Sequence, residues 1–183
     1  MSWVIWITGL PGCGKSTVAL SVKDRLPDTV ILNMDRLREV VTPEPNYSGS
    51  ERDYVYRSLT YLAKTVSELG HNVILDATGN RKVWRSVARK LIPEFFEVYL
   101  ACPLQLCMER ERARRDTHGA PADIYDKAGQ GASVPGVNVE YEVPEDPELI
   151  IDTEKLGPDE AAVMIIKMLQ KRGGLGVRGK EGL

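Results

Sequence analysis

The chain alternates between short apolar runs and longer segments in which apolar residues recur every three or four positions. Five runs have the length and composition of buried strands: WVIWIT (3–8), TVILN (29–33), NVILD (72–76), FFEVYL (95–100) and ELIID (148–152). Because these runs alternate with helical segments, the pattern predicts an α/β fold with a central parallel sheet and helices on both faces. Ligands bind to such sheets at the carboxyl ends of the strands.

Helical periodicity is clearest between the second and third runs. Apolar side chains recur there at steps of three and four residues: Val55, Leu59, Leu62, Val66 and Leu69. We expect them to form the buried face of one helix, which Gly70 is well placed to end. The last helix is expected to begin at Pro158 and to end near Lys171 and Gly173.

The stretch GLPGCGKST follows the first apolar run and precedes a helical segment. Its Gly9, Gly14, Lys15 and Ser16 fit the Walker A pattern G-x-x-x-x-G-K-[ST]. The glycines let backbone amides face a polyphosphate, Lys15 reaches the outer phosphates, and the Ser16 hydroxyl can bind Mg²⁺. The dipole of the following helix adds to the site. We therefore expect the whole loop to bind a nucleotide: Gly9, Leu10, Pro11, Gly12, Cys13, Gly14, Lys15, Ser16 and Thr17.

Composition narrows the class of protein. The chain has 183 residues, 43% of them hydrophobic, and a net charge of −2, so one domain with a full core is expected. We place this domain at residues 1–172 and expect the Gly-rich tail, 173–183, to be flexible. The net charge argues against a stable nucleic-acid partner and leaves a small molecule as the expected substrate.

The location of the protein is predicted from what the sequence lacks. No apolar run reaches the length of a membrane span, and no signal-peptide pattern precedes the first strand. The cysteines, Cys13, Cys102 and Cys107, form no C-x-x-C pair, and we interpret them as buried thiols in a reducing compartment. A cytoplasmic protein is expected, either as a monomer or as a homodimer.

Several classes of nucleotide-binding protein compete at this point. A GTPase switch would need a D-x-x-G element, which Asp76 to Gly79 supply, and also an N-K-x-D or T-K-x-D guanine reader, which the sequence lacks. A transporter ATPase would need an LSGGQ-like signature, which is also missing. A non-catalytic nucleotide-binding module should have no acceptor-activating carboxylate near the phosphates. The search for such a carboxylate therefore separates this class from the kinases.

Asp35 is the candidate carboxylate. It lies just past the second apolar run, beside the phosphate loop in the expected fold, and could accept the proton of an attacking hydroxyl or organise Mg²⁺. Arg38, one helical turn later, could hold an acceptor phosphate through two hydrogen bonds. The alternative is structural: Asp35 caps a helix and Arg38 is its ion-pair partner.

A second group of candidates follows the third run. Asp76 stands at the Walker B position, where a carboxylate can bind Mg²⁺ through water. Thr78, Asn80 and Arg81 come next, in a loop that should face the acceptor. One of these three is expected to serve only the fold, because Asn-Arg commonly opens a helix.

Basic residues crowd a segment at about 108–135, which Gly119 and Pro121 interrupt: Arg110, Arg112, Arg114, Arg115 and Lys127. In small-molecule kinases such a lid closes over the γ-phosphate and supplies positive charge while it excludes water. The alternative is a solvated helix face. We expect at least one of these arginines to reach the nucleotide.

Together these motifs resemble the adenylylsulfate (APS) kinase family over nearly the whole chain. Residues 6–17 look like the opening of that family, and NMDRLR (33–38) is similar to its D-G-D-N-x-R. YSGSER (47–52) is similar to F-S-x-x-D-R, and IYDKA (124–128) to L-Y-K-K-A. The most specific segment is GVNVEYEVPEDPELIIDT (136–153), which is close to the family's G-I-D-x-x-Y-E-x-P-x-x-P-E-L-x-x-x-T.

The resemblance implies a three-layer P-loop kinase fold and a soluble enzyme of sulfate assimilation. It also implies that ATP with Mg²⁺ phosphorylates the 3′-hydroxyl of adenosine 5′-phosphosulfate. Tyr47 and Arg52 would hold the adenylylsulfate with Arg38. Asn80, Arg81 and Lys127 would also contact this substrate, and Arg110 of the lid would bind the nucleotide. Mg²⁺ would be bound near Ser16, Asp35 and Asp76.

The sequence also departs from the family. Asn33 replaces the first Asp of D-G-D-N, Val55 replaces an Asn that binds substrate, and Val134 replaces a stacking Phe. Thr78 stands where the family has a serine that can be phosphorylated, so it joins Asp35 and Lys15 as a catalytic candidate. The lid between Arg110 and Tyr125 is longer than in the family.

Three hypotheses remain. The first is an adenylylsulfate kinase. The second is a kinase of another nucleotide-like or phosphorylated hydroxyl compound, since the DAT sequence and the Arg-rich lid look more like polynucleotide-kinase-type enzymes. The third is a nucleotide-binding regulator without turnover.

Overall fold

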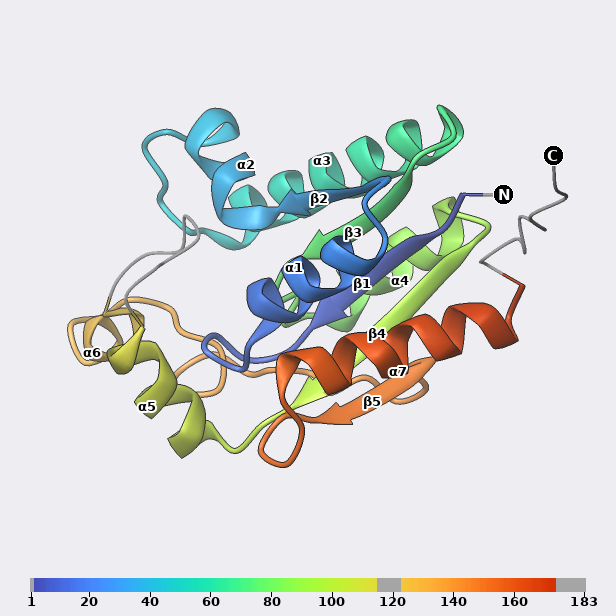
Figure 1. Cartoon of the computed structure of the whole chain (residues 1–183). Helices are drawn as coiled ribbons and strands as arrows, with labels where there is room; N and C mark the ends of the chain where they lie inside the picture. The colour runs from blue at the N-terminus through green and yellow to red at the C-terminus, as the bar shows by residue number, and fades with distance from the viewer. Residues whose placement is uncertain (1, 115–122, 174–183) are drawn as a thin grey trace, which may run out of the picture.

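The five apolar runs form the strands of one sheet in the computed structural model, which describes residues 2–114 and 123–173 (Figure 1). The strands are β1 (Val4–Thr8), β2 (Thr29–Asn33), β3 (Asn72–Asp76), β4 (Phe95–Ala101) and β5 (Leu149–Asp152). Their order across the sheet is β2-β3-β1-β4-β5, and every neighbouring pair is parallel. The predicted parallel sheet is confirmed, and its carboxyl ends share one edge.

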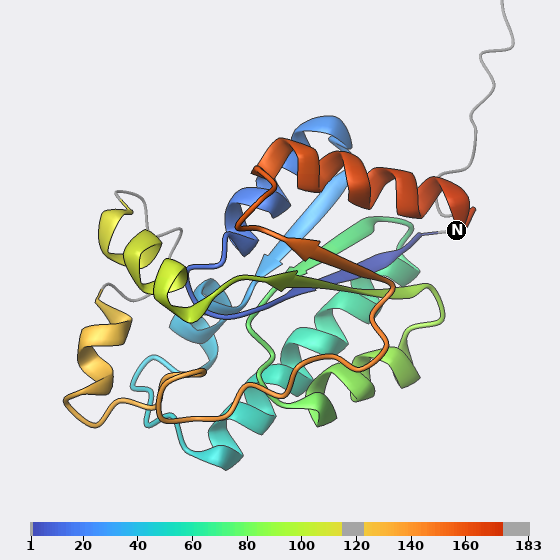
Figure 2. The ribbon, with the colours of Figure 1, turned by 90° about the horizontal axis from the view of Figure 1, so that it is seen from below.

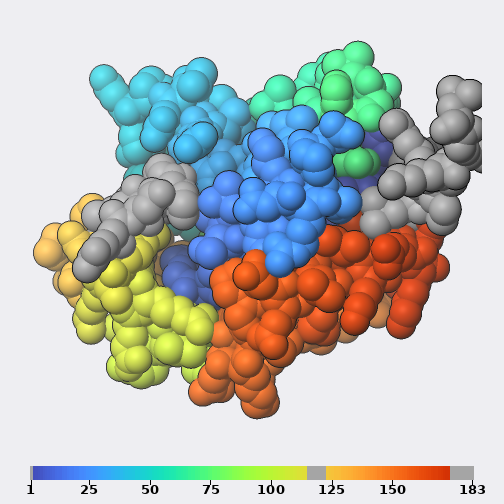
Figure 3. Space-filling model, in the orientation of Figure 1, coloured from blue at the N-terminus to red at the C-terminus, as the bar shows by residue number. Residues whose placement is uncertain are grey.

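Helices form the outer two layers of the fold. In the described residues they are α1 (Lys15–Arg25), α2 (Met34–Val41), α3 (Gly49–Glu68), α4 (Lys82–Leu91), α5 (Leu104–Ala113), α6 (Ile124–Ala128) and α7 (Pro158–Lys171). Figure 2 shows α1 and α7 on one face of the sheet and α3 and α4 on the other. On the surface, α1 lies between α2 and α7 (Figure 3). The three-layer α/β class predicted from the sequence is therefore confirmed.

The central strand β1 shows why the apolar runs are continuous. Ile5 and Ile7 belong to the core cluster that contains side chains of α1 and α7. Val4 and Trp6 belong to the opposite cluster, with side chains of α3 and α4. Because successive side chains of a strand point to opposite faces, a strand covered on both faces needs apolar residues at every position.

The buried face of α3 differs from the predicted one. Leu62 is 39% exposed and Leu69 is 73% exposed, so neither belongs to the core. The buried side chains are Val55, Tyr56, Leu59, Thr60 and Ala63. Val55 and Leu59 belong to both the predicted face and the buried face, which is rotated toward Tyr56 and Ala63 because the helix packs on β3 and α4. Leu69 is the cap residue after the last helical residue, Glu68. Gly70, with φ +96°, follows this end as predicted.

The last helix begins at Pro158 and ends at Lys171, as predicted. The assignment of one domain to residues 1–172 and of a lid to about 108–135 stays a prediction. Arg115, Gly119 and Pro121 of the lid, and the tail after Gly173, lie outside the described residues. In the described part of the chain, no helix is long and apolar enough to cross a membrane.

Candidate active site

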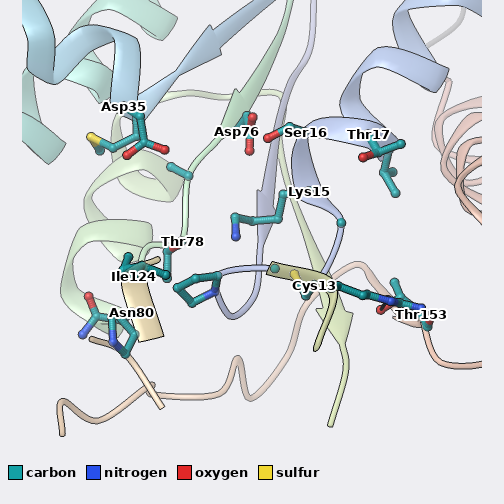
Figure 4. A pocket seen from close by; sticks show the side chains of 18 of the residues that line it. Cys13, Lys15, Ser16, Thr17, Asp35, Asp76, Thr78, Asn80, Ile124 and Thr153 are labelled. Atoms are coloured by element: carbon teal, nitrogen blue, oxygen red, sulfur yellow. Dashed lines mark hydrogen bonds between the residues drawn. The ribbon is translucent and has the colours of Figure 1, made fainter. Parts of the chain in front are cut away.

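A cavity of about 490 Å³ lies at the carboxyl ends of the strands. It gathers most of the predicted site residues from segments far apart in the sequence: Pro11, Gly12, Cys13, Gly14, Lys15, Ser16, Thr17, Asp35, Arg38, Tyr47, Arg52, Asp76, Thr78, Asn80 and Arg110. Figure 4 shows side chains of Lys15, Ser16, Asp35 and Asp76 around this cavity. Four predicted residues do not line it: Gly9, Leu10, Arg81 and Lys127.

The phosphate loop has the backbone conformation that a polyphosphate cradle requires. Gly12 and Gly14 have φ values of +79° and +102°, in the left-handed region that favours glycine. Gly14 also precedes α1 and offers no side chain to cap it. The first amides of α1, at Lys15 and Ser16, therefore have no acceptor within the helix and suit the oxygens of a phosphate.

Gly9 and Leu10 act on the site through their carbonyl groups. Lys15 Nζ donates to Gly9 O at 3.1 Å and to Leu10 O at 2.9 Å. These two acceptors hold the ammonium group of Lys15 against the loop. A negatively charged phosphate is a stronger partner for this ammonium than a neutral carbonyl, so the same side chain is placed to bind a nucleotide.

Cys13 belongs to the loop as a packing residue. It is completely buried, and burial raises the pKa of its thiol, so the thiol is neutral at pH 7. The neighbouring Gly12 lies so close to Cys107 of α5 that a side chain at position 12 would collide with the Cys107 carbonyl. The three cysteines are free thiols; Cys13 and Cys107 are buried as predicted, whereas Cys102 is only partly buried.

The structural alternative for Asp35 is not supported by the contacts of α2. The side chain that caps this helix is Asn33, whose Oδ1 accepts hydrogen bonds from Asp35 N and Arg36 N at 3.0 Å each. Arg38 pairs with Glu51, at 3.1 Å between Nη1 and Oε1. The Asp35 carboxylate is therefore left to face the cavity. Burial raises its pKa above the usual value for aspartate, although the Lys15 ammonium opposes this shift.

The oxygen atoms around this carboxylate fit Mg²⁺. Ser16 contributes a hydroxyl, and Asp35 and Asp76 contribute carboxylates, which are the hard ligands that Mg²⁺ prefers. Among the described residues there is no cluster of three or more His, Cys, Asp or Glu side chains that could hold a metal alone. This small donor set agrees with a Mg²⁺ ion that keeps water and phosphate ligands.

Glu51 organises the side of the cavity that Arg38 and Tyr47 line, a role that sequence reasoning missed. Besides its ion pair with Arg38, it accepts hydrogen bonds from the backbone of Asn46 at 2.7 Å and Tyr47 at 3.1 Å. Tyr47 has a φ of +54°, which is uncommon for a residue with a side chain, and its ring lies 5.2 Å from the Arg38 guanidinium carbon. The signal was present as Ser48-x-x-Glu51, since Ser48 Oγ accepts from Glu51 N at the start of α3.

An aromatic stack supports the loop after β3. The Tyr56 ring lies between Trp6 and Trp84, with centroid distances of 5.9 and 4.0 Å. Gly79 N donates to the Tyr56 hydroxyl at 3.0 Å, and Trp6 Nε1 donates to Ala77 O at 2.9 Å. Gly79 has a φ of +54°, and a side chain there would collide with the Trp6 ring. These contacts fix the loop that presents Thr78 to the cavity.

The segment 136–153 lies against the same loop. Thr8 Oγ1 donates to Thr78 O at 2.6 Å and lies 2.8 Å from the Tyr141 hydroxyl. Asn80 is 2% exposed and donates to Glu140 O at 2.9 Å. Buried Arg85 completes the support with hydrogen bonds to Gly79 O and Glu142 O. Asn80 therefore serves the fold as well as lining the cavity.

Arg81 points elsewhere. It is exposed, and its guanidinium lies 5.8 Å from the centre of the Trp84 ring, outside the cavity lining. Lys127 of α6 is also exposed and outside the lining. The structure therefore does not bring these two residues to the other predicted site residues, and their substrate-binding roles stay predictions.

The arginines at the end of α5 fall into two groups. Arg110 lines the cavity and donates to Thr153 O at 2.7 Å. Arg114 also lines the cavity, and its guanidinium donates to buried Glu111 at 3.2 Å. Arg112 is exposed and pairs with Asp126 at 3.0 Å, as expected for a solvated helix face. The charge run is thus divided between the site and the surface.

A phosphate loop between a strand and a helix, oxygen ligands for Mg²⁺ and arginines around one cavity define a P-loop phosphotransferase. The family model for adenylylsulphate kinase matches residues 1–152. The chain therefore belongs to the adenylylsulfate kinase family, as the resemblance predicted, and is an ATP-dependent kinase of hydroxyl groups.

The chain matches two curated relatives over nearly the full length of those relatives. A probable adenylyl-sulfate kinase of Archaeoglobus fulgidus is 35% identical over 161 residues, which are 85% of this chain and 98% of that protein. A probable adenylyl-sulfate kinase of Pyrococcus abyssi is 32% identical and covers 93% of this chain and 97% of that protein.

Solved structures agree with the family. An APS kinase of Mycobacterium tuberculosis in complex with AMPPNP and APS has a TM-score of 0.81 and 30% identity, and covers 92% of this chain and 98% of that one. A sugar kinase of Janibacter sp. HTCC2649 has a TM-score of 0.68 at 18% identity, and shows a common fold only.

Proposed function

We propose that this protein transfers the γ-phosphate of ATP to the 3′-hydroxyl of adenosine 5′-phosphosulfate, which gives 3′-phosphoadenylylsulfate. One observation carries the proposal: a single cavity is lined both by the phosphate loop and by Arg38, Tyr47 and Arg52. These three residues occupy the positions at which the sequence is similar to the substrate motifs of the family. The named kinase relatives support the same activity.

In this proposal the two substrates meet at Asp35. Lys15 and the amides of the loop hold the outer phosphates of ATP, and Asp35 accepts the proton of the attacking hydroxyl. Ser16, Asp76 or Asp35 would hold Mg²⁺, which would neutralise charge on the phosphates. The raised pKa of Asp35 makes its carboxylate a stronger base and therefore a better proton acceptor.

On the acceptor side, Arg38 and Arg52 bind the anionic phosphosulfate, and Tyr47 packs on the adenine. Arg52 reaches across the cavity and donates to Ser133 O at 3.1 Å, so it links α3 to the segment that follows α6. Thr78 faces the acceptor from the loop after β3. Arg110, beside Thr153, contacts the bound ATP.

The substituted acceptor residues imply weak binding of adenylylsulfate. Val55 and Val134 are completely buried in the two core clusters and do not line the cavity. Val55 cannot make the hydrogen bond of the family's Asn to the substrate, which costs about 1 kcal/mol of binding free energy. Val134 cannot make the stacking contact of the family's Phe, which costs about 1 kcal/mol more. Together they correspond to roughly a ten- to hundredfold higher KM.

An ADP-release assay with a panel of acceptors tests the proposal. Adenylylsulfate should stimulate ADP release above the background of ATP hydrolysis, whereas AMP, ribose phosphates and a 5′-hydroxyl oligonucleotide should not. Stimulation only by another hydroxyl compound would favour a redirected kinase. ATP binding without turnover on any acceptor would favour a regulator.

Arg52→Ala should raise the KM for adenylylsulfate about tenfold and leave the KM for ATP unchanged, because it removes one charge-assisted hydrogen bond to the acceptor. Initial rates at varied adenylylsulfate measure this effect. Arg57→Ala is the matched control, since Arg57 is exposed on the same helix and pairs with Asp53. Equal KM values in the two variants would remove Arg52 from the acceptor site.

Arg114→Ala should lower kcat at least tenfold, because Arg114 lines the cavity and supplies positive charge near the transferred phosphoryl group. Arg112→Ala, two positions earlier and exposed, should stay within about twofold of the wild type. Steady-state rates at saturating substrates give both values. An equal loss in the two variants would indicate a general effect of charge, and no loss in either would exclude Arg114 from the transfer.

Assembly and location belong to the same proposal. The free cysteines agree with a reducing cytoplasm, where adenylylsulfate kinases would meet ATP. We propose a homodimer in solution. A related APS kinase of Thiobacillus denitrificans is described as hexameric, and light scattering would decide the state of this chain.

A further inference from the structure

The side chain of Asn33 joins two parts of the proposed metal site. Its Oδ1 caps α2 by accepting hydrogen bonds from Asp35 N and Arg36 N, at 3.0 Å each. Its Nδ2 donates to Asp76 Oδ2 at 2.7 Å. One amide group therefore connects the helix that carries Asp35 to the carboxylate at the end of β3.

The two strands that carry this contact are already aligned. Asn33 and Asp76 are register partners at the carboxyl ends of β2 and β3, so the backbone brings both side chains to the same edge of the sheet. Asp76 is 4% exposed, and a buried carboxylate needs a hydrogen-bond donor or a cation. In the described structure, the donor to Asp76 is Asn33.

The amide also sets the charge of the site. An aspartate at position 33 could still cap α2, because its carboxylate accepts hydrogen bonds as well as an amide oxygen does. It could not donate to Asp76 as a carboxylate, and it would place two like charges in direct contact. Such a pair is stable only if a proton or a cation lies between the oxygens.

We infer that Asn33 is a positioning residue that orients the Asp76 carboxylate toward the bound metal and limits the site to two carboxylates, Asp35 and Asp76. This inference rests on the proposed metal-dependent phosphoryl transfer. It does not depend on which compound accepts the phosphate. The resulting site has fewer negative charges than one with aspartate at position 33, and therefore a lower affinity for divalent cations in the absence of nucleotide.

Two substitutions separate the cap from the contact with Asp76. Asn33→Ser keeps a side-chain oxygen for the cap, but its shorter side chain lacks the amide group that donates to Asp76. Asn33→Asp keeps the cap and replaces the donor by a negative charge. If Asn33 were only a cap, both variants would behave like the wild type in every measurement that reports on the metal.

Thermal unfolding and Mn²⁺ binding give readouts that need no acceptor. Without a divalent cation, Asn33→Asp should unfold at a lower temperature than the wild type, and Mn²⁺ should raise its Tm more than it raises that of the wild type. By electron paramagnetic resonance in the presence of ADP, Asn33→Asp should bind Mn²⁺ at least threefold more tightly, and Asn33→Ser about threefold more weakly. Mn²⁺ affinities of both variants within twofold of the wild type would overturn the inference.

Kinetics complete the test. Asn33→Ser should lower kcat about tenfold and change the KM for ATP less than twofold, because Asp76 loses its orientation while the phosphate loop stays intact. An unchanged kcat in a folded Asn33→Ser variant would contradict the positioning role. If the wild type transfers no phosphate to adenylylsulfate, the proposed function fails, whereas the Mn²⁺ measurements still decide the role of Asn33.

Discussion

Lys15→Ala is expected to reduce kcat by about 10²- to 10³-fold, the scale reported for loss of one preorganised group that stabilises charge in a transition state. The ammonium group is held at the loop by the carbonyls of Gly9 and Leu10, at 3.1 and 2.9 Å. The phosphates of ATP provide a stronger partner for this charge, and the interaction grows as charge develops on the transferred group. The loss should therefore fall on kcat more than on ATP binding.

Lys23→Ala is the matched control for this variant. Lys23 is exposed in the last turn of α1 and does not line the cavity. Its removal should leave kcat within about twofold of the wild type. Both variants should unfold near the wild-type temperature. Wild-type turnover by Lys15→Ala would refute the assignment of GLPGCGKST as the catalytic phosphate loop.

Asp35→Asn is expected to lower kcat about a hundredfold or more while ATP still binds, because the substitution keeps the shape of the side chain and removes the proton acceptor. The helix start should remain intact, since the cap is supplied by Asn33. Single-turnover rates with saturating ATP and adenylylsulfate measure the chemical step.

An exposed carboxylate provides the comparison. Asp24→Asn changes a residue of α1 outside the cavity and should leave the single-turnover rate unchanged. If Asp35→Asn keeps most of the wild-type rate, Asp35 is not the base, and Asp76 becomes the next candidate.

The strands and the phosphate loop could be predicted because their signals are local. A continuous apolar run is required wherever a strand is covered on both faces, and GxxxxGKS is the local signature of one class of loop whose backbone amides enclose phosphates. The end of α3 just before Gly70 and the start of α7 at Pro158 also depend on single residues with special backbone conformations.

The exposed side of α3 could not be predicted in the same way. The periodicity of Leu59, Leu62 and Val66 fits two overlapping helix faces, and only packing on β3 and α4 selects the face that contains Tyr56 and Ala63. The spacing of Leu62 predicts a core position, whereas the structure leaves its side chain partly exposed.

The connections within the site are also invisible in a linear sequence. In the sequence, Asn33 only marks the replacement of a family aspartate, whereas in the structure its side chain caps α2 and donates a hydrogen bond to Asp76. Glu51 reads as one acidic residue of a helix start, whereas it holds Arg38 and the backbone of Tyr47. The role of Asn33 arises from the pairing of β2 with β3, and the role of Glu51 arises from the packing of α3 against α2.

The central claim is that the phosphoryl group of ATP reaches the 3′-hydroxyl of adenylylsulfate. The most direct measurement incubates the wild-type protein with γ-labelled ATP, Mg²⁺ and adenylylsulfate, and identifies the labelled product by chromatography before and after treatment with a 3′-specific phosphatase. The account predicts a labelled nucleotide with the mobility of 3′-phosphoadenylylsulfate, whose label the phosphatase releases. A folded, ATP-binding protein that transfers no label to adenylylsulfate, or that labels a different position, would contradict the account.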